Sequence, residues 1–463
     1  MAISSIGVGS NLPLGDLLES LRKSENQALN LIKFQQTSAE NRFSAYGTLK
    51  STIEALKKTS DALGKAETFG ALKTSANGDA FTAVATSSAV AAEYSIKITD
   101  LASSQTLVAA GQADRATTIA GEGDTGPIDI EIALGNDSKK TITINKEDTS
   151  IDGIMKAINN DPELGVSATV INDGLESPFR LVLTAKATGT KAAVTSITVT
   201  GSPNLQGAIG YNSDDGNLFE QTAAENAKLT VNGLAIVSQS NTIRDVLDGV
   251  TLTLSKKTTE PTILSIARDD AVTSAAINAF VTAYNKLQGT VNSLTSFNVE
   301  QKSQSALTGD SLTRSIQSRI RGTLNVDESS GPIRTLAQLG ITTNPNNGML
   351  EVNTSKLNAA LADNMIDVQK LFAAESGISA TLGAVADTFI KSGGLINNAT
   401  DSIATIRKTL QRQYDATSDR IDQKMETYRR QFTALDSMVA QMNSVSTYLT
   451  QQLSMLGNIS NSK

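Results

Sequence analysis

The sequence predicts a multidomain α+β protein, in which a terminal α-helical coiled coil and a helical-bundle rod carry nested β-rich domains in the middle. Residues 14–63 and 403–456 repeat apolar side chains with a period of about 3.5 residues, which favours long helices packed side by side. The middle of the 463-residue chain is rich in Thr, Ser and Gly and contains alternating apolar residues typical of strands. Helical patterns return from about residue 271. The β-rich middle is therefore predicted to be an insertion into a helical rod.

The two terminal stripes predict long rods. Alternate steps of four and three residues run from Leu14 to Leu63 over mostly apolar side chains, and the same steps run from Ile403 to Leu456. This period keeps one seam on one side of a supercoiled helix, so each stripe needs a partner along its length. Pro13 stands just before the first stripe, where a helix start tolerates proline. Fifty helical residues extend about 75 Å, which is too long for a compact domain.

The side chains of the stripes indicate where these partners lie. Residues 43–63 carry large apolar side chains, and for them a bundle within the chain and contact with another chain both remain open. Polar residues interrupt the seams in residues 1–42 and 430–463. The interrupting residues are Glu25, Gln35, Gln431 and Gln452. Because helices with such seams are marginal alone, we expect these two ends to order against a neighbouring protein chain.

The composition excludes several classes of function. The chain has neither His nor Cys, which excludes Cys–His and Ser–His–Asp catalysis, disulfides and the usual zinc sites. Its net charge is −7 and it has no run of Lys and Arg, so we expect no nucleic-acid partner. No apolar run is long enough to cross a bilayer, and the first basic residue is Arg22, which argues against a secretory signal and membrane insertion.

Two segments of the middle repeat a strand–helix–strand pattern. In the first, a helix containing Ile151 and Ile158 is followed by a strand through residues 166–170. In the second, residues 229–231 predict a strand that ends in an Asn-Gly turn. Ser240 or Asn241 is then expected to cap a helix through Ile243, Val246 and Leu247, with a strand at 250–254. We interpret both segments as scaffold.

The returning helices define the predicted domain boundaries. Apolar faces predict helices within residues 276–294, 312–324 and 357–372, and Asn347-Gly348 predicts a hairpin turn between the last two. The predicted domains are a terminal coiled-coil leg of residues 1–42 with 417–463, a helical bundle with a small hairpin of 43–74 with 271–416, a β-rich domain of 75–100 with 217–270, and an inserted β-rich domain of 101–216.

Three motifs resemble chemical sites without their required context. Residues 121–126 match the G-x-G-x-x-G dinucleotide fingerprint, but Pro127 and a strand pattern follow where a helix is needed, so we predict a loop. Ser20 and Lys23 have the S-x-x-K spacing on an exposed helix and lack the other motifs of that chemistry. The pairs Asp214-Asp215 and Asp269-Asp270 are not in an EF-hand spacing. We therefore expect no catalytic, cofactor or metal site.

Several segments resemble one bacterial family in the same order along the chain. They include the start "MAISSIGVGSNLPLGDLLESL", the strand "YSIKITDLASSQTL", the piece "RTLAQLGITTNPNNGMLEVNTSKLNAAL" and the end "DATSDRIDQKMETYRRQFTALDSMVAQMNSVSTYLTQQL". These segments are similar to the flagellar filament cap family, hook-associated protein 2 (FliD). The part from about residue 101 to 216 matches least.

The resemblance implies a structural protein at the tip of the bacterial flagellum. Such a protein leaves the cell unfolded by the flagellar type III route, forms a homo-oligomeric ring, holds exported flagellin and promotes its folding and polymerisation. The terminal seams would contact flagellin or neighbouring axial proteins through Ile3, Ile6, Leu14, Leu18, Leu21, Ile32, Met442, Val445, Leu449 and Leu456. A cytoplasmic export chaperone would engage Met438, Met442, Val445 and Leu449 before secretion.

Three other functions remain open from the sequence. Flagellin or a hook–filament junction protein would share terminal heptads with this chain. An extracellular adhesin would bind through residues 75–270. A hydrolase would have to use Ser20 or Lys23, and the absence of His and Cys argues against it.

Overall fold

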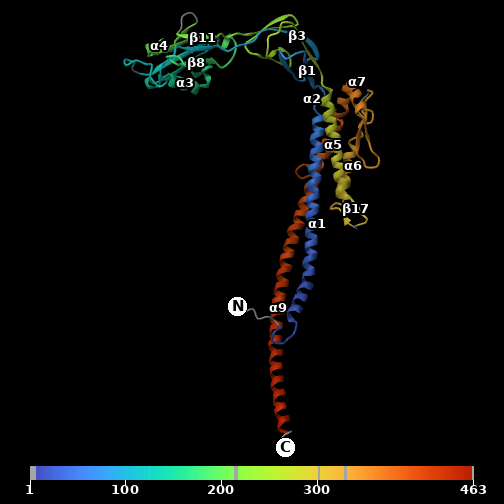
Figure 1. Ribbon diagram of the computed structural model, residues 1–463. Helices are drawn as coiled ribbons and strands as arrows, with labels where there is room; N and C mark the ends of the chain where they lie inside the picture. Colours follow the sequence, from blue (N-terminus) through green and yellow to red (C-terminus); the bar gives the residue numbers. More distant parts are fainter. Residues whose placement is uncertain (1–6, 125, 213–216, 301–302, 328–330, 461–463) are drawn as a thin grey trace. The chain divides into compact units, whose positions relative to one another are not determined.

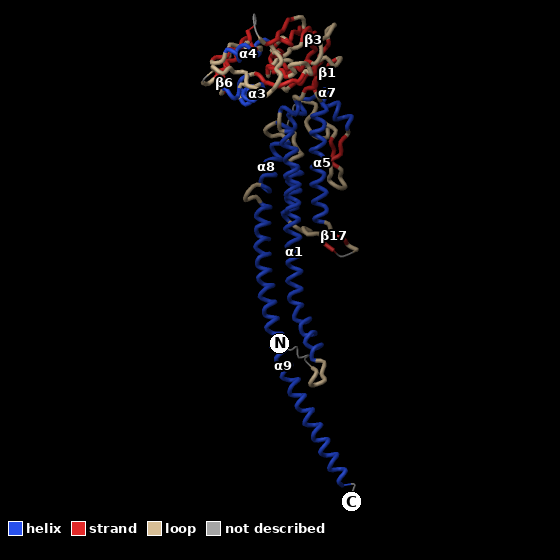
Figure 2. Tube along the Cα trace, turned by 60° about the vertical axis from the view of Figure 1, so that its left-hand side comes forward, coloured by secondary structure: helices blue, strands red, loops and turns tan. Residues whose placement is uncertain are grey.

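The computed structural model describes residues 7–124, 126–212, 217–300, 303–327 and 331–460, with the side chains of 456–460 left out. The chain divides into two compact units, Met1–Phe69 with Thr273–Lys463, and Gly70–Val272. The first unit is mainly helical and the second mainly β (Figure 1, Figure 2). The predicted fold class is therefore confirmed, with a β-rich middle inserted into a helical rod. The finer division into four domains stays a prediction.

The helical unit is built from long helices and two small hairpins. Its elements are α1 (Leu14–Leu63), α2 (Ala66–Phe69), α5 (Asp270–Thr295), β17 (Phe297–Asn298), β18 (Ser303–Gln304), α6 (Ser311–Gly322), β19 (Ile341–Thr343), β20 (Leu350–Val352), α7 (Thr354–Ala373), α8 (Ile378–Ile390) and α9 (Leu395–Ser460). The helices predicted within 276–294, 312–324 and 357–372 correspond to α5, α6 and α7. The hairpin predicted at Asn347-Gly348 is the β19–β20 pair, in which Gly348 has a φ of +73°.

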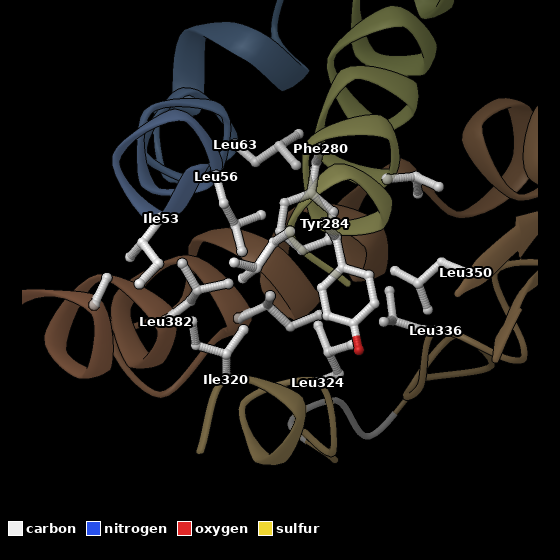
Figure 3. Close-up of a cluster of buried hydrophobic side chains, with 14 of the residues drawn as sticks. Ile53, Leu56, Leu63, Phe280, Tyr284, Ile320, Leu324, Leu336, Leu350 and Leu382 are labelled. Atoms are coloured by element: carbon white, nitrogen blue, oxygen red, sulfur yellow. The ribbon is translucent and has the colours of Figure 1, made fainter. Parts of the chain in front are cut away.

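The bundle core lies where the second half of α1 meets the other helices. Figure 3 shows side chains from α1, α5, α6 and α8 converging with Leu336 and Leu350. Leu56 and Tyr284 have no exposed surface, and the ring of Phe280 packs edge-on against Phe372 at 6.0 Å between centroids. Burial of this many apolar side chains supplies most of the stability of such a bundle. Residues 43–63 thus take the intramolecular partner, one of the two possibilities left open by the sequence.

Asp310 joins α1 to α6 at the edge of this core. Its Oδ1 accepts a bond from the backbone N–H of Thr313 at 2.8 Å and so caps α6. Its Oδ2 accepts the hydroxyl hydrogen of Tyr46 on α1 at 2.6 Å. Burial, together with the Asp310 carboxylate, raises the pKa of Tyr46 to about 12. Burial opposes ionisation of Asp310, but the bonds from Tyr46 and Thr313 outweigh it and lower the pKa of this carboxyl.

The described residues of the β-rich unit form four antiparallel sheets. Its strands are β1 (Leu72–Ala76), β2 (Phe81–Ala85), β3 (Ala92–Asp100), β4 (Thr106–Ala109), β5 (Ile128–Leu134), β6 (Lys139–Ile144), β7 (Val166–Asn172), β8 (Phe179–Ala185), β9 (Val194–Thr200), β10 (Tyr211–Asn212), β11 (Leu218–Thr222), β12 (Ala227–Val231), β13 (Leu234–Ser238), β14 (Thr242–Leu247), β15 (Val250–Leu254) and β16 (Thr262–Arg268). The strand orders are β1-β16-β3-β12-β13, β14-β15-β2, β10-β9-β5-β6 and β11-β4-β8-β7. Two helices, α3 (Ile151–Asn160) and α4 (Pro203–Ile209), pack on the last two sheets.

Two separate apolar cores hold this unit. One contains Ile96, Ile98 and Leu264 between the five-stranded and three-stranded sheets. The other contains Ile130, Ile154 and Leu183 between the two four-stranded sheets and α3. Alternation along each strand directs every second side chain into a core, which is why the sequence pattern locates these strands.

The first strand–helix–strand prediction is confirmed. Ser150 caps α3 through a bond from the backbone N–H of Gly153 at 3.1 Å, and Ile154 and Ile158 are buried. The loop prediction for residues 121–126 is also confirmed for its described residues, since they precede strand β5 rather than a helix.

The second strand–helix–strand prediction is wrong, because Ile243, Val246 and Leu247 lie in strand β14. Asn241 does not cap a helix; its side-chain amide bonds both the N–H and the C=O of Ala102 at 2.8 Å. The Gly249 turn then pairs β14 with β15, Ile243 lying opposite Leu252. This six-residue segment is too short for propensity to outweigh the neighbouring strand.

We predict that Asp310→Ala lowers the free energy of unfolding of the helical unit by about 1–2 kcal/mol, because the helix loses its cap and Tyr46 loses its acceptor. Chemical denaturation followed by circular dichroism measures this change. The matched control is Asp363→Ala, which removes an exposed acid from α7 and should change stability by less than about 0.5 kcal/mol.

The same contact predicts a pH dependence. A carboxyl whose pKa is lowered in the folded state contributes stability above its unfolded pKa, and that stability is lost as pH falls through the folded pKa. The difference between the native protein and Asp310→Ala should therefore shrink in acid. An undiminished difference at low pH would contradict this role.

Candidate interaction site: the two-helix rod and the free end of α9

The first half of α1 lies antiparallel to α9 and forms a two-helix rod (Figure 1, Figure 2). Arg22 and Asp422 form an ion pair of 2.9 Å across the helices, and Gln36 donates to Gln411 at 3.0 Å. We define the rod as residues 14–42 of α1 with 403–436 of α9. Residues 14–42, which looked unpartnered in the sequence, therefore meet α9 of their own chain, whereas most of the stretch 430–463 lies beyond the rod.

Charged residues on or beside the two seams pair across the rod. Glu25 lies against Lys424, and Glu40 lies against Arg407, each as an ion pair. The contact with Glu25 raises the pKa of Lys424. The expectation that residues 14–42 lack a partner within the chain is therefore wrong. Glu25, a seam position that seemed to weaken the helix, carries a charge that Lys424 of α9 complements.

Four of the predicted seam residues face α9. Leu14 is 5% exposed, and Leu18, Leu21 and Ile32 are partly buried. Across from them Ile421 and Met425 of α9 are buried. In this arrangement these four side chains hold the rod together, and their contact with another protein stays a prediction.

A different apolar set on α1 faces outward. Leu31 is 60% exposed, Phe34 is 72% exposed and Leu17 is 48% exposed. These residues lie beside the 3.5-residue seam rather than on it, so stepping along the seam missed them. The sequence does show these residues as apolar positions outside the seam. They become candidates for contact with a partner once the seam itself is known to be covered.

An N-terminal loop closes the rod at Asp436. The Asp436 carboxylate accepts the backbone N–H of Ser10 at 2.7 Å and that of Gly9 at 3.3 Å. Gly9 sits so close to α9 that an added Cβ would lie 3.1 Å from the Cβ of Ala440. Bonds from Ser10 and the adjacent backbone lower the pKa of Asp436. We call residues 7–12 with Asp436 the N-terminal clasp; Ile3 and Ile6 lie outside the described residues.

Beyond the clasp, no other described element of the chain covers α9. Met438, Met442, Val445 and Leu449 are 62%, 64%, 57% and 54% exposed. Their spacing of four, three and four residues places them on one face of the helix, where they line a shallow groove with Leu453. We call residues 437–455 the free end of α9. The side chain of Leu456 lies outside the described residues.

The exposed stripe is too apolar for a solvated helix surface. Tyr448, Leu453 and Met455 extend it, each at least 59% exposed. An amphipathic helix with its apolar face in water is the usual donor in helix-in-groove and coiled-coil recognition. Methionine and leucine suit partners of different shapes, because methionine side chains are flexible. The free end is therefore the candidate site for a protein partner.

The described residues of the remaining candidate motifs have ordinary ion-pair and hydrogen-bond partners. Lys23 pairs with Glu19 at 2.8 Å, and this bond raises the pKa of Lys23, whereas a Ser/Lys nucleophile pair needs it lowered. Asp270 pairs with Arg268, and the Asp269 side chain accepts the N–H of Ala271. Asp214-Asp215 lies outside the described residues. Within the described ranges, we find no acidic cluster that would hold a metal ion and no helix suited to cross a membrane.

Family models match both parts of the chain that flank its centre. The flagellar hook-associated protein 2 N-terminus model matches residues 10–105, and the C-terminus model of the same family matches residues 224–444. The chain belongs to the flagellar hook-associated protein 2 family. The resemblance noted in the sequence is thereby confirmed. Residues between the two matches coincide closely with the segment that resembles the family least.

Relatives from this family align over the full chain. Flagellar hook-associated protein 2 of Escherichia coli (strain K12) is 39% identical, with 100% of both chains covered. The same protein of Salmonella typhimurium is 37% identical over 97% of this chain and 98% of the relative. A crystal structure titled as the D1-D2-D3 domains of the flagellar cap protein FliD from Escherichia coli has a TM-score of 0.69 and 38% identity. The alignment covers 78% of this chain and 99% of the chain in that structure.

We predict that exchanging the charges of one ion pair weakens the rod of this hook-associated protein 2 family member and that exchanging both restores it. Glu25→Lys places two cations against each other, whereas Glu25→Lys with Lys424→Glu recreates an attractive pair. Hydrogen exchange of the amides in residues 14–35 should accelerate in the single variant and recover in the double variant. The effect should fade at high salt. Equal exchange in both variants would argue against pairing.

We predict that Asp436→Ala opens the N-terminal clasp without unfolding the bundle, because residues 9 and 10 lose their common acceptor. Hydrogen exchange of residues 7–13 should then rise. Asp419→Ala, which removes an exposed acid from the same helix, serves as the matched control and should leave this exchange unchanged. Because the pKa of Asp436 is lowered, acid should open the clasp of the native protein as pH falls through that pKa. Protection of residues 7–13 that persists in Asp436→Ala would disprove the clasp.

Proposed function

We propose that this chain caps the distal end of the bacterial flagellar filament, holds exported flagellin there and promotes its folding and polymerisation. The observation that carries this function is the similarity of the whole chain to hook-associated protein 2 of Escherichia coli, together with the likeness to a crystal structure titled as a flagellar cap protein. The absence of His and Cys and the solvated state of Ser20 and Lys23 fit a structural role. Its work is on folding and assembly rather than on covalent bonds.

The free end of α9 is the part that fits an assembling tip. Its apolar stripe has no covering element within the described residues, so it gains most from burial against a second protein. The charges at the surface of the rod give contacts that are individually weak. A helix held by weak contacts releases and rebinds as each subunit arrives, whereas a fully apolar seam would hold it in one place.

Met442, Val445, Leu449 and Leu456 remain the proposed contacts with flagellin or neighbouring axial proteins. Leu14, Leu18, Leu21 and Ile32 would reach such a partner only where the rod opens, since they face α9. Leu17, Leu31 and Phe34 already face outward on α1 and need no such opening. Ile3 and Ile6 keep the role expected from the sequence.

The other partners belong to the same proposal. Several copies of the chain form a ring at the filament tip. A cytoplasmic export chaperone covers Met438, Met442, Val445 and Leu449 before export by the flagellar type III route. The place of action is extracellular, at the end of the flagellum. Neither an adhesin nor a hook–filament junction protein has support among the relatives described above, which carry the name hook-associated protein 2.

We predict that charging the apolar stripe abolishes capping. Met442→Asp with Leu449→Asp puts two carboxylates on the face that needs an apolar partner. In a strain that carries this variant as its only cap protein, filaments should be short or absent, and unpolymerised flagellin should accumulate in the medium. Electron microscopy measures filament length, and immunoblotting measures flagellin and the exported variant.

The matched control places the same charge on the opposite face of the same helix. Ser444→Asp with Gln451→Asp adds two carboxylates at exposed polar positions and should leave filament growth normal. Export of both variants is measured so that a failure of secretion is recognised. Normal filaments in the strain with the charged apolar stripe, at equal export, would rule out this site.

A further inference from the structure

The chain contains three Asn-Gly dipeptides, at Asn77, Asn232 and Asn347. Glycine lacks a Cβ. Its backbone nitrogen is therefore less hindered than that of any other residue that can follow asparagine. All three dipeptides lie in turns of the structure. They differ in how firmly the asparagine amide and the glycine nitrogen are held, and this difference carries a prediction about their chemistry.

We propose that Asn77 is a spontaneous modification site, where the folded chain loses its side-chain amide ahead of the other Asn-Gly positions and gains aspartate and isoaspartate. The backbone nitrogen of Gly78 attacks the Asn77 Cγ, the bond from Cγ to Nδ2 breaks, and ammonia leaves. This gives a five-membered cyclic imide. Water then opens either carbonyl of the imide, so the net change replaces NH2 with OH and consumes only water.

The turn at Asn77 does not restrain the two groups that react. Asn77 and Gly78 are exposed in the turn between β1 and β2. Within the described part of the chain, the Asn77 side chain forms no hydrogen bond and the Gly78 N–H has no backbone acceptor. Gly78 has a φ of +137°, and an added Cβ would meet nothing within 4 Å. The amide of Asn77 therefore rotates freely toward the nitrogen of Gly78.

The other two amides are fixed. The Oδ1 of Asn232 accepts the backbone N–H of Ser95 at 2.8 Å, and the Asn232 N–H donates to the Ser95 carbonyl at 2.8 Å. Both the side chain and the backbone N–H of Asn232 are thus hydrogen-bonded to strand β3. The Oδ1 of Asn347 accepts the N–H of Met349 at 2.9 Å. At Asn347 the attacking nitrogen is held too, because the Gly348 N–H donates to the Asn344 carbonyl at 2.9 Å.

The modification would change the turn of the β-rich unit that follows the pairing of β1 with β16. The Asn77 N–H donates to the Ile263 carbonyl at 3.3 Å and so extends the pairing of β1 with β16. Isoaspartate adds one carbon to the backbone of this turn, and either product adds a carboxylate beside Asp79. The Asp79 carboxylate already pairs with Lys256. A second carboxylate would compete for that cation, so the product is more acidic and its turn less firmly held.

The full-length protein, incubated in mildly alkaline buffer and digested at intervals, tests the proposal. Mass spectrometry follows the mass change from NH2 to OH in the three peptides, and an isoaspartyl methyltransferase with labelled methyl donor detects isoaspartate. In the folded protein, the peptide with Asn77 should convert several-fold faster than the other two. In denaturant the three rates should converge, since the hydrogen bonds that hold Asn232 and Asn347 are lost.

Two outcomes would overturn the proposal. One is conversion at Asn232 or Asn347 as fast as at Asn77 in the folded protein. The other is the same ranking in denaturant, which would assign the difference to neighbouring sequence rather than to structure. Asn77→Ser provides the control, because it should remove the first acidic species seen on ion-exchange chromatography and leave the slower ones.

Discussion

The antiparallel contact of α1 with α9 is the constraint on which the candidate site depends. It joins the first and last helices of the chain and fixes their register through pairs such as Arg22–Asp422 and Glu25–Lys424. Helix α9 has 66 residues and α1 has 50. Because α1 begins at Leu14, next to the N-terminal clasp, no described element of the chain covers the rest of α9. The free end, about 30 Å long, is a consequence of this unequal pairing.

The chemistry of the rod differs from that of the bundle in a way that matters for function. Around Leu56, Phe280 and Tyr284 the core is closed and apolar. Along residues 14–42 the helices meet through a narrow apolar seam flanked by exposed ion pairs, which contribute little to stability individually. A firm bundle therefore carries a more labile extension. Such a gradient fits the exchange of partners that we propose for the free end of α9.

The β-rich unit contributes a different kind of surface. Its two apolar cores support four antiparallel sheets, and the core around Ile130 and Ile154 lies largely between the two family matches. Strand alternation is sufficient to build that core, since many different side chains satisfy it. This explains why the segment keeps a regular fold where its sequence resembles the family least.

The sequence by itself determined the long terminal helices, most strands, the first helix-containing repeat, the hairpin at Asn347-Gly348 and the family. It also identified Met438, Met442, Val445 and Leu449 as one stripe. These features depend on local period and turn chemistry, which neighbouring residues encode.

The tertiary structure decided what covers each stripe. A heptad shows which side chains need burial but not which helix buries them, so the sequence did not reveal that Leu14 and Ile32 face α9. For the same reason β14 became a strand: its partner β15 outweighed the helical spacing of Ile243 and Leu247.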